Sequence, residues 1–329
     1  MTDLAAASFV MTAADGSGAL PASNGLVRQR RRRVESSQLL WIRCRGKVTV
    51  CGSGGGDLLF HDFKSIFFYY DIARTYRLLR YLMHSGTILA GVFRNLAAIS
   101  LGANRLSGII PPSIFNLSSL TVLDMSYCNH LTGSIPEDIG ITLPNLQYLG
   151  LDNNQFTGSI PISISNLSDL GLFQVSHNNL IGKVPTMEGL HKIQFINILD
   201  NQLGSEGVDD DLSFICSSIN ATNLKVLSVD RNKFGGMHPK CVGNLSTNLE
   251  LFSVADNDIS GSIPTGIENL INLNWLNMWS NKFNGNILTN IGKLIKLNKL
   301  KLDDNNFYGN IPSPIGNFEC FKPVDFEKQ

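Results

Sequence analysis

The sequence lacks any hydrophobic run long enough to cross a membrane, which takes roughly 18 to 20 consecutive apolar residues in a helix. The most apolar candidate, residues 66–83, is interrupted by Asp71, Arg74, Arg77 and Arg80. The N-terminus is also unlike a secretory signal, because its short apolar run follows an acidic residue instead of a basic segment. The sequence alone therefore predicts no membrane insertion by this chain and contains no convincing signal peptide.

The motifs of common enzyme chemistry are absent as well. There is no Gly-rich loop followed by a strand lysine, no His-Arg-Asp loop and no Asp-Phe-Gly segment. The segment GSGGG at residues 52–56 lacks the Lys-Ser/Thr of a phosphate-binding loop and is more typical of a flexible linker. The six histidines stand apart from one another and from any Ser or Cys nucleophile motif. We therefore expect no enzyme, no catalytic residues and no cofactor.

The cysteines show no metal-ligand spacing, so we expect no metal site. Four of the six lie in different repeats or in the tail, and we expect these to be free structural thiols: Cys128, Cys216, Cys241 and Cys320.

Net charge is zero, but this balance hides two different parts of the chain. Residues 1–90 hold 12 Lys and Arg against 6 Asp and Glu, whereas residues 91–329 hold 15 against 21, giving +6 and −6. The basic run at residues 28–33 has the composition of a nuclear-localisation or nucleic-acid segment, but no interleaved aromatic residues accompany it. We interpret it as a solvated run and expect no nucleic-acid partner.

What the sequence does contain is a string of the form L-x-L-x-x-N-x-L-x-G-x-I-P that returns about every 24 residues. Eight regular copies are centred on Asn104, Asn154, Asn178, Asn201, Asn232, Asn257, Asn281 and Asn305, which we call the ladder asparagines. A ninth copy, at residues 123–131, carries a one-residue insertion around Cys128 and Asn129. A repeat this short cannot bury its own apolar face and must stack on its neighbours, so the period predicts a solenoid.

Each position of the repeat has a physical interpretation. The paired aliphatic residues alternate with polar ones, which predicts a half-buried strand, and stacked strands make one parallel sheet about 40 Å long. The ladder asparagine follows the strand and offers its amide to backbone groups that the bend leaves unpaired. The later glycine relaxes the next bend, and the proline, which cannot donate, belongs on the outer side.

The closing L-x-G-x-I-P resembles the plant-specific class of leucine-rich repeats over residues 91–318. The irregular 31-residue step from Asn201 to Asn232 is similar to a repeat of grass pattern-recognition receptor kinases. The resemblance implies a right-handed superhelix of the α/β horseshoe type, with a concave parallel sheet and an irregular or 3-10 convex side. It also implies an extracellular sensing ectodomain on a membrane receptor with a cytoplasmic Ser/Thr kinase, acting in immunity or development.

We expect a poorly ordered region at residues 1–78, a degenerate lead-in repeat at 79–98, the solenoid at 99–318 and a tail at 319–329. Within the first region, Cys44 and Cys51 have the spacing of this family's capping disulfide, although the Trp and Gly-Val that the family carries between them are replaced. With neither a kinase nor an anchor recognisable, one interpretation is a truncated, non-signalling repeat protein, either decoy-like or the product of a pseudogene. The other is the ligand-recognition module of a receptor.

Four asparagines stand in N-x-S/T sequons: Asn116, Asn166, Asn220 and Asn244. Three of them share one phase of the repeat, so glycans there would occupy one lateral or outer face and leave the strand face bare. The alternative is that Asn-Leu-Ser simply belongs to the repeat consensus.

A peptide or protein ligand, and a co-receptor if one takes part, would meet the residues that alternate outward on the concave strands. The predicted contact residues are Tyr148, Asp152, His177, Phe195, Asp230, Arg231, Asp256, Trp275, Trp279, Lys299 and Lys301. Two tryptophans on one strand, flanked by charges of both signs, have the composition of an interaction hot spot. The other interpretation is that these aromatic residues only stack across neighbouring strands.

Overall fold

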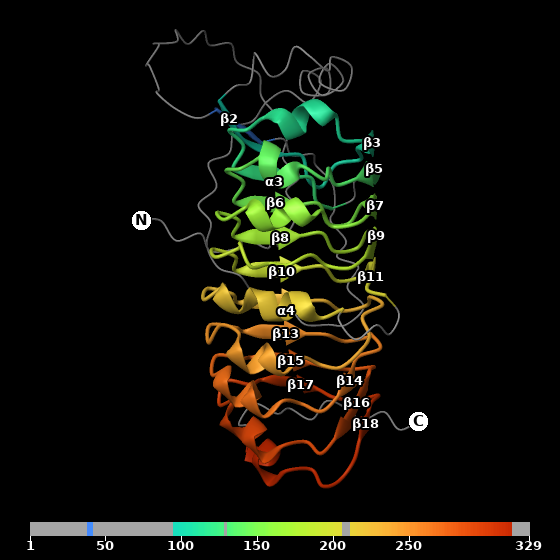
Figure 1. Cartoon of the computed structure of the whole chain (residues 1–329), viewed down its shortest axis with the longest axis vertical. Helices are drawn as coiled ribbons and strands as arrows, with labels where there is room; N and C mark the ends of the chain where they lie inside the picture. The colour runs from blue at the N-terminus through green and yellow to red at the C-terminus, as the bar shows by residue number, and fades with distance from the viewer. Residues whose placement is uncertain (1–37, 42–94, 128–129, 206–210, 318–329) are drawn as a thin grey trace, which may run out of the picture.

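The computed structural model describes residues 38–41, 95–127, 130–205 and 211–317. Its coils stack along one axis into an elongated solenoid (Figure 1). The predicted leucine-rich-repeat fold is confirmed. The predicted Cys44–Cys51 disulfide, the insertion around Cys128 and Asn129, and the tail lie outside the described residues.

The main sheet contains ten parallel strands, and their order in space follows their order in the chain. Its strands are β1 (Gln38–Trp41), β2 (Leu96–Ser100), β4 (Val122–Asp124), β6 (Tyr148–Gly150), β8 (Leu172–Gln174), β10 (Phe195–Asn197), β12 (Val226–Ser228), β13 (Leu251–Ser253), β15 (Trp275–Asn277) and β17 (Lys299–Lys301). From β4 to β17 equivalent residues of successive coils pair directly, so each outward position forms a continuous row across the sheet.

Shorter strands form two further parallel sheets at one edge of the stack (Figure 1), which the sequence interpretation did not include. One holds β3 (Ser107–Ile109), β5 (His130–Ser134), β7 (Gln155–Gly158), β9 (Asn179–Gly182) and β11 (Gln202–Leu203), and the other β14 (Ser260–Gly261), β16 (Lys282–Gly285) and β18 (Asn306–Phe307). Four of these strands end on a repeat glycine, such as Gly158 with a φ of +79°, a conformation that glycine adopts without strain.

The convex side is built from short helices, as predicted. They are the 3-10 helices η1 (Pro112–Asn116), η2 (Ile162–Asn166), η3 (Ser218–Asn220), η4 (Lys240–Asn244), η5 (Thr265–Asn269), η6 (Thr289–Lys293) and η7 (Ser313–Asn317), with α3 (Ile139–Thr142) and α4 (Ser213–Ser217). A proline precedes several of them, and its carbonyl accepts the first helical hydrogen bond, as from Ile114 N to Pro111 O at 2.9 Å. The fixed φ of proline suits this entry position, where no amide donor is needed.

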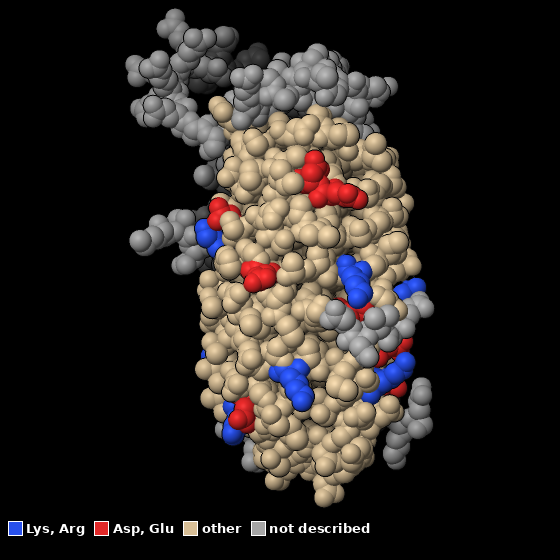
Figure 2. Space-filling model, in the orientation of Figure 1, with Lys and Arg blue, Asp and Glu red and all other residues tan. Residues whose placement is uncertain are grey.

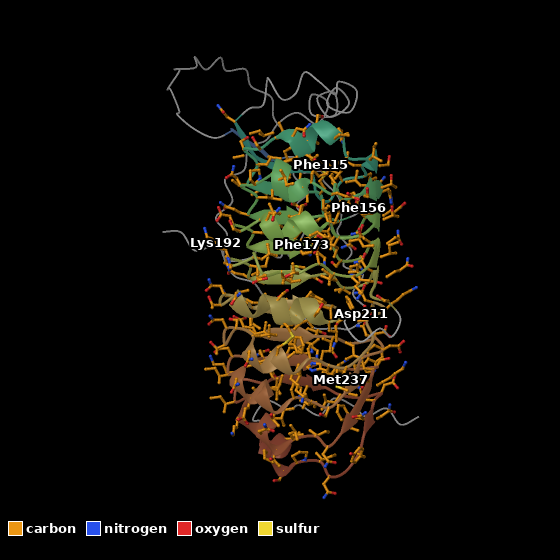
Figure 3. All side chains as sticks on the ribbon, in the orientation of Figure 1. Phe115, Phe156, Phe173, Lys192, Asp211 and Met237 are labelled. Atoms are coloured by element: carbon orange, nitrogen blue, oxygen red, sulfur yellow. A yellow bond between two sulfur atoms is a disulfide. The ribbon has the colours of Figure 1, made fainter. Side chains whose placement is uncertain are left out.

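The apolar core runs the length of the stack between the main sheet and the convex helices. Each coil contributes the inward residue of its strand, for example Leu149 and Phe173, together with aliphatic residues from the turns. Figure 3 shows Phe115, Phe156 and Phe173 inside the stack. One contiguous core therefore joins all the described coils, as expected for repeats that are stable only when stacked.

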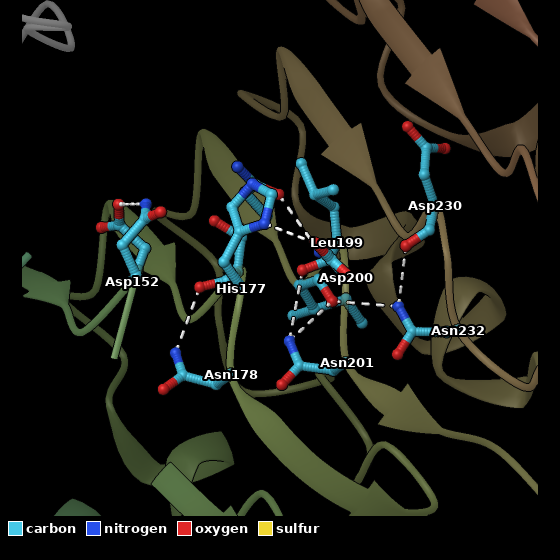
Figure 4. Close-up of polar contacts among 12 residues, drawn as sticks. Asp152, His177, Asn178, Leu199, Asp200, Asn201, Asp230 and Asn232 are labelled. Carbon is cyan, nitrogen blue, oxygen red and sulfur yellow. Dashed lines mark hydrogen bonds and ion pairs between the residues drawn. The ribbon is translucent and has the colours of Figure 1, made fainter. Parts of the chain in front are cut away.

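The ladder asparagines are hydrogen-bonded as predicted (Figure 4). Asn178 Nδ2 donates to the carbonyls of Leu151, Val175 and Ser176 at 3.0 to 3.1 Å, and its Oδ1 accepts from the amide of Phe156 at 2.9 Å. Because two of these partners belong to the preceding coil, each amide joins two coils while it closes its own bend.

The irregular coil between Asn201 and Asn232 carries α4 and η3 on the convex side. The buried carboxylate of Asp211 accepts hydrogen bonds from the backbone and hydroxyl of Ser205, both at 2.8 Å, and from the amide of Gly235 at 3.3 Å. One carboxylate therefore connects this coil to the next.

Cys216 of α4 and Cys241 of η4 form a disulfide between neighbouring coils, with their Cα atoms 5.5 Å apart. The prediction of free thiols is wrong for these two residues. The physical reason is stacking, which brings residues of equal phase in successive coils within disulfide distance.

Candidate functional site

The candidate site is the outer face of the main sheet. On the strands from β4 to β15 the central residue is buried in the core, and its two neighbours lie on the opposite face, as the two-residue period of a strand requires. The outward positions lie six, four and two residues before each ladder asparagine, and a rim position lies one residue before it.

The row six residues before the ladder asparagines is an unbroken line of large apolar side chains. We call its part from β6 to β15 the apolar stripe, which contains Tyr148, Leu172, Phe195, Val226, Leu251 and Trp275 paired in register. The half-buried Val122 of β4 pairs with Tyr148 and precedes the stripe in the same row. These side chains are half-buried, apart from the more deeply buried Leu172. Lys299 follows Trp275 in the same row and ends the stripe.

Trp275 and Lys299 contact each other across β15 and β17. The Lys299 Nζ lies 4.9 Å from the centroid of the Trp275 ring, a cation–π geometry. The indole nitrogen of Trp275 is buried without a hydrogen-bond partner. Trp279, also half-buried, lies four residues further along. A cross-strand cation–π contact is thus present at Trp275, and the ring remains half-buried at this end of the stripe.

The next row, four residues before the ladder asparagines, is small and polar. It contains Gly150, Gln174, Asn197, Ser228, Ser253, Asn277 and Lys301, of which Gly150, the two serines and Asn277 are buried. This row runs beside the apolar stripe, and its amide and hydroxyl groups provide hydrogen-bond donors and acceptors.

Of two predicted contact residues with acidic side chains, Asp152 is almost fully buried and Asp230 is half-buried. Burial raises the pKa of each carboxyl to about 6. Asp230 Oδ1 accepts a hydrogen bond from the amide of Ala255 at 2.8 Å, so this carboxylate joins neighbouring coils. Asp152 Oδ2 accepts from Asn153 Nδ2 at 3.0 Å, and its Oδ1 has no partner.

The rim carries the remaining predicted contact residues. His177 Nδ1 lies 2.6 Å from Asp200 Oδ2 on the next coil (Figure 4). Arg231 is half-buried and Asp256 is exposed. Rim residues share a left-handed backbone, with φ of +50° to +62° in nine coils, so the bend places each side chain at an equivalent point on the edge.

All four sequon asparagines are exposed on the convex side, each as the last residue of a 3-10 helix, η1 to η4. The structure therefore separates them from the outer face of the main sheet. On the face shown in Figure 2, charged side chains are scattered singly or in small groups among uncharged residues.

Within the described ranges, no group of three or more His, Cys, Asp or Glu side chains is placed to hold a metal ion. The same part of the chain contains no helix with the length and apolarity that a membrane span needs.

Two residues of the site were missed by the sequence interpretation, Asp124 and Tyr127. They belong to the coil with the insertion, which was left out of the predicted face. The alternation of Val122, Asp124 and Ser126 with buried Leu123 and Met125 carries the signal that identifies this coil as equivalent to the others.

Comparison with known proteins is consistent with this architecture. A family model described as Leucine Rich Repeat matches residues 95–117, 119–140, 145–167 and 223–245. The LRR receptor-like serine/threonine-protein kinase EFR of Arabidopsis thaliana is 38% identical over 89 residues, which are 27% of this chain and 8% of that protein. The receptor kinase-like protein Xa21 of Oryza sativa subsp. japonica is 40% identical over 67 residues, 20% of this chain and 6% of that protein.

Among solved structures, the Arabidopsis receptor kinase HAESA, in complex with the peptide hormone IDA and the co-receptor SERK1, matches with a TM-score of 0.63 and 28% identity. The match covers 69% of this chain and 36% of that one. The chain contains leucine-rich repeats and is homologous over an ectodomain-like region to plant leucine-rich-repeat receptor-like kinases. It spans less than a tenth of the EFR and Xa21 sequences and about a third of the HAESA chain.

Proposed function

We propose that this chain is a recognition module that binds an extended peptide along the outer face of its main sheet. The observation that carries the proposal is the apolar stripe from Tyr148 to Trp275, which runs in register across six strands and is half-exposed at every position except Leu172. Continuous apolar surface of this kind is uncommon on a protein without a partner.

The dimensions of the stripe favour a peptide. Six strands at a spacing of about 4.8 Å span roughly 24 Å, the length of about seven extended residues. The neighbouring polar row, including Gln174 and Asn197, provides donors and acceptors for the peptide backbone. HAESA, whose structure holds a peptide hormone, supports the same ligand class.

The disulfide and the sequons support an extracellular location. Disulfides such as Cys216–Cys241 persist mainly in oxidising compartments. The exposed asparagines Asn116, Asn166, Asn220 and Asn244 are placed where glycans would leave the main sheet uncovered. We therefore include secretion and N-glycosylation in the proposal, together with a role as part of a receptor that signals across a membrane.

The test is selection from a displayed library of random peptides of about ten residues against the folded chain. Enriched peptides should lose most of their affinity for the Phe195→Ala and Trp275→Ala variants. The matched control is Ile295→Ala, which removes an 83% exposed apolar side chain outside the main sheet. If no peptide is enriched, or if the control weakens binding as much as the stripe variants do, the repeat protein without a signalling partner becomes the better description.

A further inference from the structure

At the end of the stripe opposite to Trp275, two tyrosines and two carboxylates lie close together. Tyr148 is the first residue of the stripe, and Tyr127 lies at the rim of the preceding coil. Asp124 ends β4 and pairs in register with Gly150, while Asp152 follows β6 by two residues. Two neighbouring coils thus supply two aromatic rings and two acids.

Gly150 shows how closely these groups approach. A Cβ atom added there would lie 2.8 Å from Cε1 of Tyr148, 2.7 Å from the Ser126 hydroxyl and 3.1 Å from Asp124 Oδ1. The Tyr148 ring therefore lies against Gly150, in space that any other side chain would occupy. This glycine provides room for the ring beside both carboxylates.

The Tyr127 side chain reaches this cluster from the rim. Its hydroxyl lies near the side chain of Gln174, at the end of β8. Because β6 lies between β4 and β8, the Tyr127 side chain spans the coil that contains Asp152. Tyr127 itself is 42% exposed, whereas Asp152 is 1% exposed.

Among the described residues, the two carboxylates beside these rings have no cationic partner. Asp124 accepts hydrogen bonds from Ser100 Oγ at 2.8 Å and from Ser126 N at 3.1 Å. Oδ1 of Asp152 is buried without a partner. Within the part of the chain that the structure describes, neither carboxylate forms an ion pair with Lys, Arg or His.

The pKa values of Asp152 and Tyr127 reflect the free-energy cost of burying these groups together. Burial, with a smaller contribution from Asp124, raises the pKa of Asp152 to about 6. Burial and the Asp152 carboxylate raise the pKa of Tyr127 to about 12. A cation placed among these groups would stabilise the ionised carboxyl and recover part of the desolvation cost.

We propose that Tyr127, Tyr148, Asp124 and Asp152 form a subsite for a basic side chain, Lys or Arg, of a peptide bound along the apolar stripe. The inference rests on the proposed function and specifies its ligand class. The faces of tyrosine rings attract cations, and paired carboxylates provide charge-assisted hydrogen bonds.

The opposite end of the stripe provides an internal comparison. There the chain's own Lys299 already lies over Trp275. At the Tyr148 end no residue of the described ranges plays that part. Among the described residues the first position therefore has its cation, and the second has none.

The probe is N-acetyl-argininamide, compared with N-acetyl-citrullinamide, which has a similar shape and no charge. Binding is followed by NMR on protein labelled at its tyrosine rings. The arginine compound should shift the Tyr127 and Tyr148 signals saturably and bind roughly tenfold tighter than the citrulline compound, since a charge-assisted hydrogen bond is worth about 1.5 kcal/mol or more.

Asp152→Asn should reduce that preference to nearly none, and Tyr127→Leu should weaken binding of the arginine compound while the exposed position keeps the fold intact. The matched control is Asp258→Asn, which removes an equal charge from an exposed carboxylate paired with Lys282. Equal binding of the two compounds by the wild type, or an unchanged preference in Asp152→Asn, would overturn the subsite. The peptide selection decides the proposed function separately, because peptides that need Trp275 but carry no enriched basic residue would retain that function without this subsite.

Discussion

Asn178 Oδ1 accepts a hydrogen bond of 2.9 Å from the backbone amide of Phe156, a residue one coil earlier. The same contact recurs between Leu180 and Asn201, and between Phe234 and Asn257. Each amide group therefore pairs buried backbone groups of two coils, which makes the ladder a connection along the solenoid as well as a local turn device.

Replacing Asn178 by Ala should lower the free energy of unfolding by about 3 kcal/mol. The substitution leaves the carbonyls of Leu151 and Val175 and the amide of Phe156 buried without this partner. Urea denaturation of the purified chain measures the loss. The control is Asn179→Ala at the exposed neighbouring position, which should change stability by less than about 0.5 kcal/mol. Equal effects at both positions would show that the ladder contributes little.

Most of the fold could be predicted from the sequence because the same pattern of apolar residues and asparagine recurs in each coil. The apolar pairs flanking each outward residue, as at Leu149 and Leu151, predicted the strands of the main sheet. The recurring asparagine predicted the ladder. The outward rows followed from alternation alone, which orders residues such as Trp275 and Lys299 correctly across strands. Alternation did not predict the depth of Asp152, because burial there depends on side chains from neighbouring coils.

The side sheets and the disulfide were harder to predict from the sequence. Strands of two to five residues, such as β11 and β14, are too short to show a two-residue period. The disulfide did leave a signal. Cys216 precedes Asn232 by 16 residues and Cys241 precedes Asn257 by 16, so the two share one phase in adjacent coils. That signal has meaning only after the stacking geometry is known.

Removing the disulfide with the Cys216→Ser and Cys241→Ser double variant should lower the free energy of unfolding by about 3.5 kcal/mol, the loop-closure entropy for a sequence separation of 25 residues. Urea denaturation compares the variant with the oxidised wild type. Reduced wild type is the internal control and should match the variant. If reduction has no effect, the bond does not form in solution.

Replacing His238 by Ile should stabilise the protein. His238 stands where other repeats have a buried isoleucine such as Ile263, it is 5% exposed, and neither ring nitrogen has a hydrogen-bond partner. Its ring packs edge-on against Phe252 and Phe283. Removing two unpaired buried polar atoms should raise the free energy of unfolding by about 1 to 2 kcal/mol at neutral pH, measured by denaturation. The exposed His191→Ile is the control and should gain nothing.

The stabilisation by His238→Ile should grow at acid pH. Burial lowers the pKa of His238 to about 4, from an ordinary value of 6.5. The pKa of His238 is lower in the folded state than in the unfolded state, so protonation favours unfolding. The wild type therefore keeps its full stability above pH 6.5 and loses stability as the pH falls towards 4. Between pH 7 and 5 the advantage of the variant should increase by about 2 kcal/mol. A constant difference across that range would mean that His238 titrates normally.

The carboxyls of Asp152 and Asp230 act in the opposite direction. Burial raises their pKa values to about 6. Their contribution to the free energy of unfolding is therefore fully present below pH 3.8 and is lost as the pH rises through 6. Both are present in the wild type and in His238→Ile, so their effects cancel when the two proteins are compared at each pH.

Trp275→Ala should weaken binding of a peptide selected on this face by at least about 30-fold, the loss typical of a central aromatic contact. The ring is half-buried beneath Lys299, so truncation removes apolar contact and leaves the ammonium without its aromatic partner. Lys299→Met separates the two effects, because it keeps an apolar cover over the ring and removes the charge. If Lys299→Met binds as the wild type does while Trp275→Ala does not, the ring itself contacts the ligand. If both bind as the wild type does, Trp275 serves only to stack across β15 and β17, and ligand contact must lie nearer to Phe195.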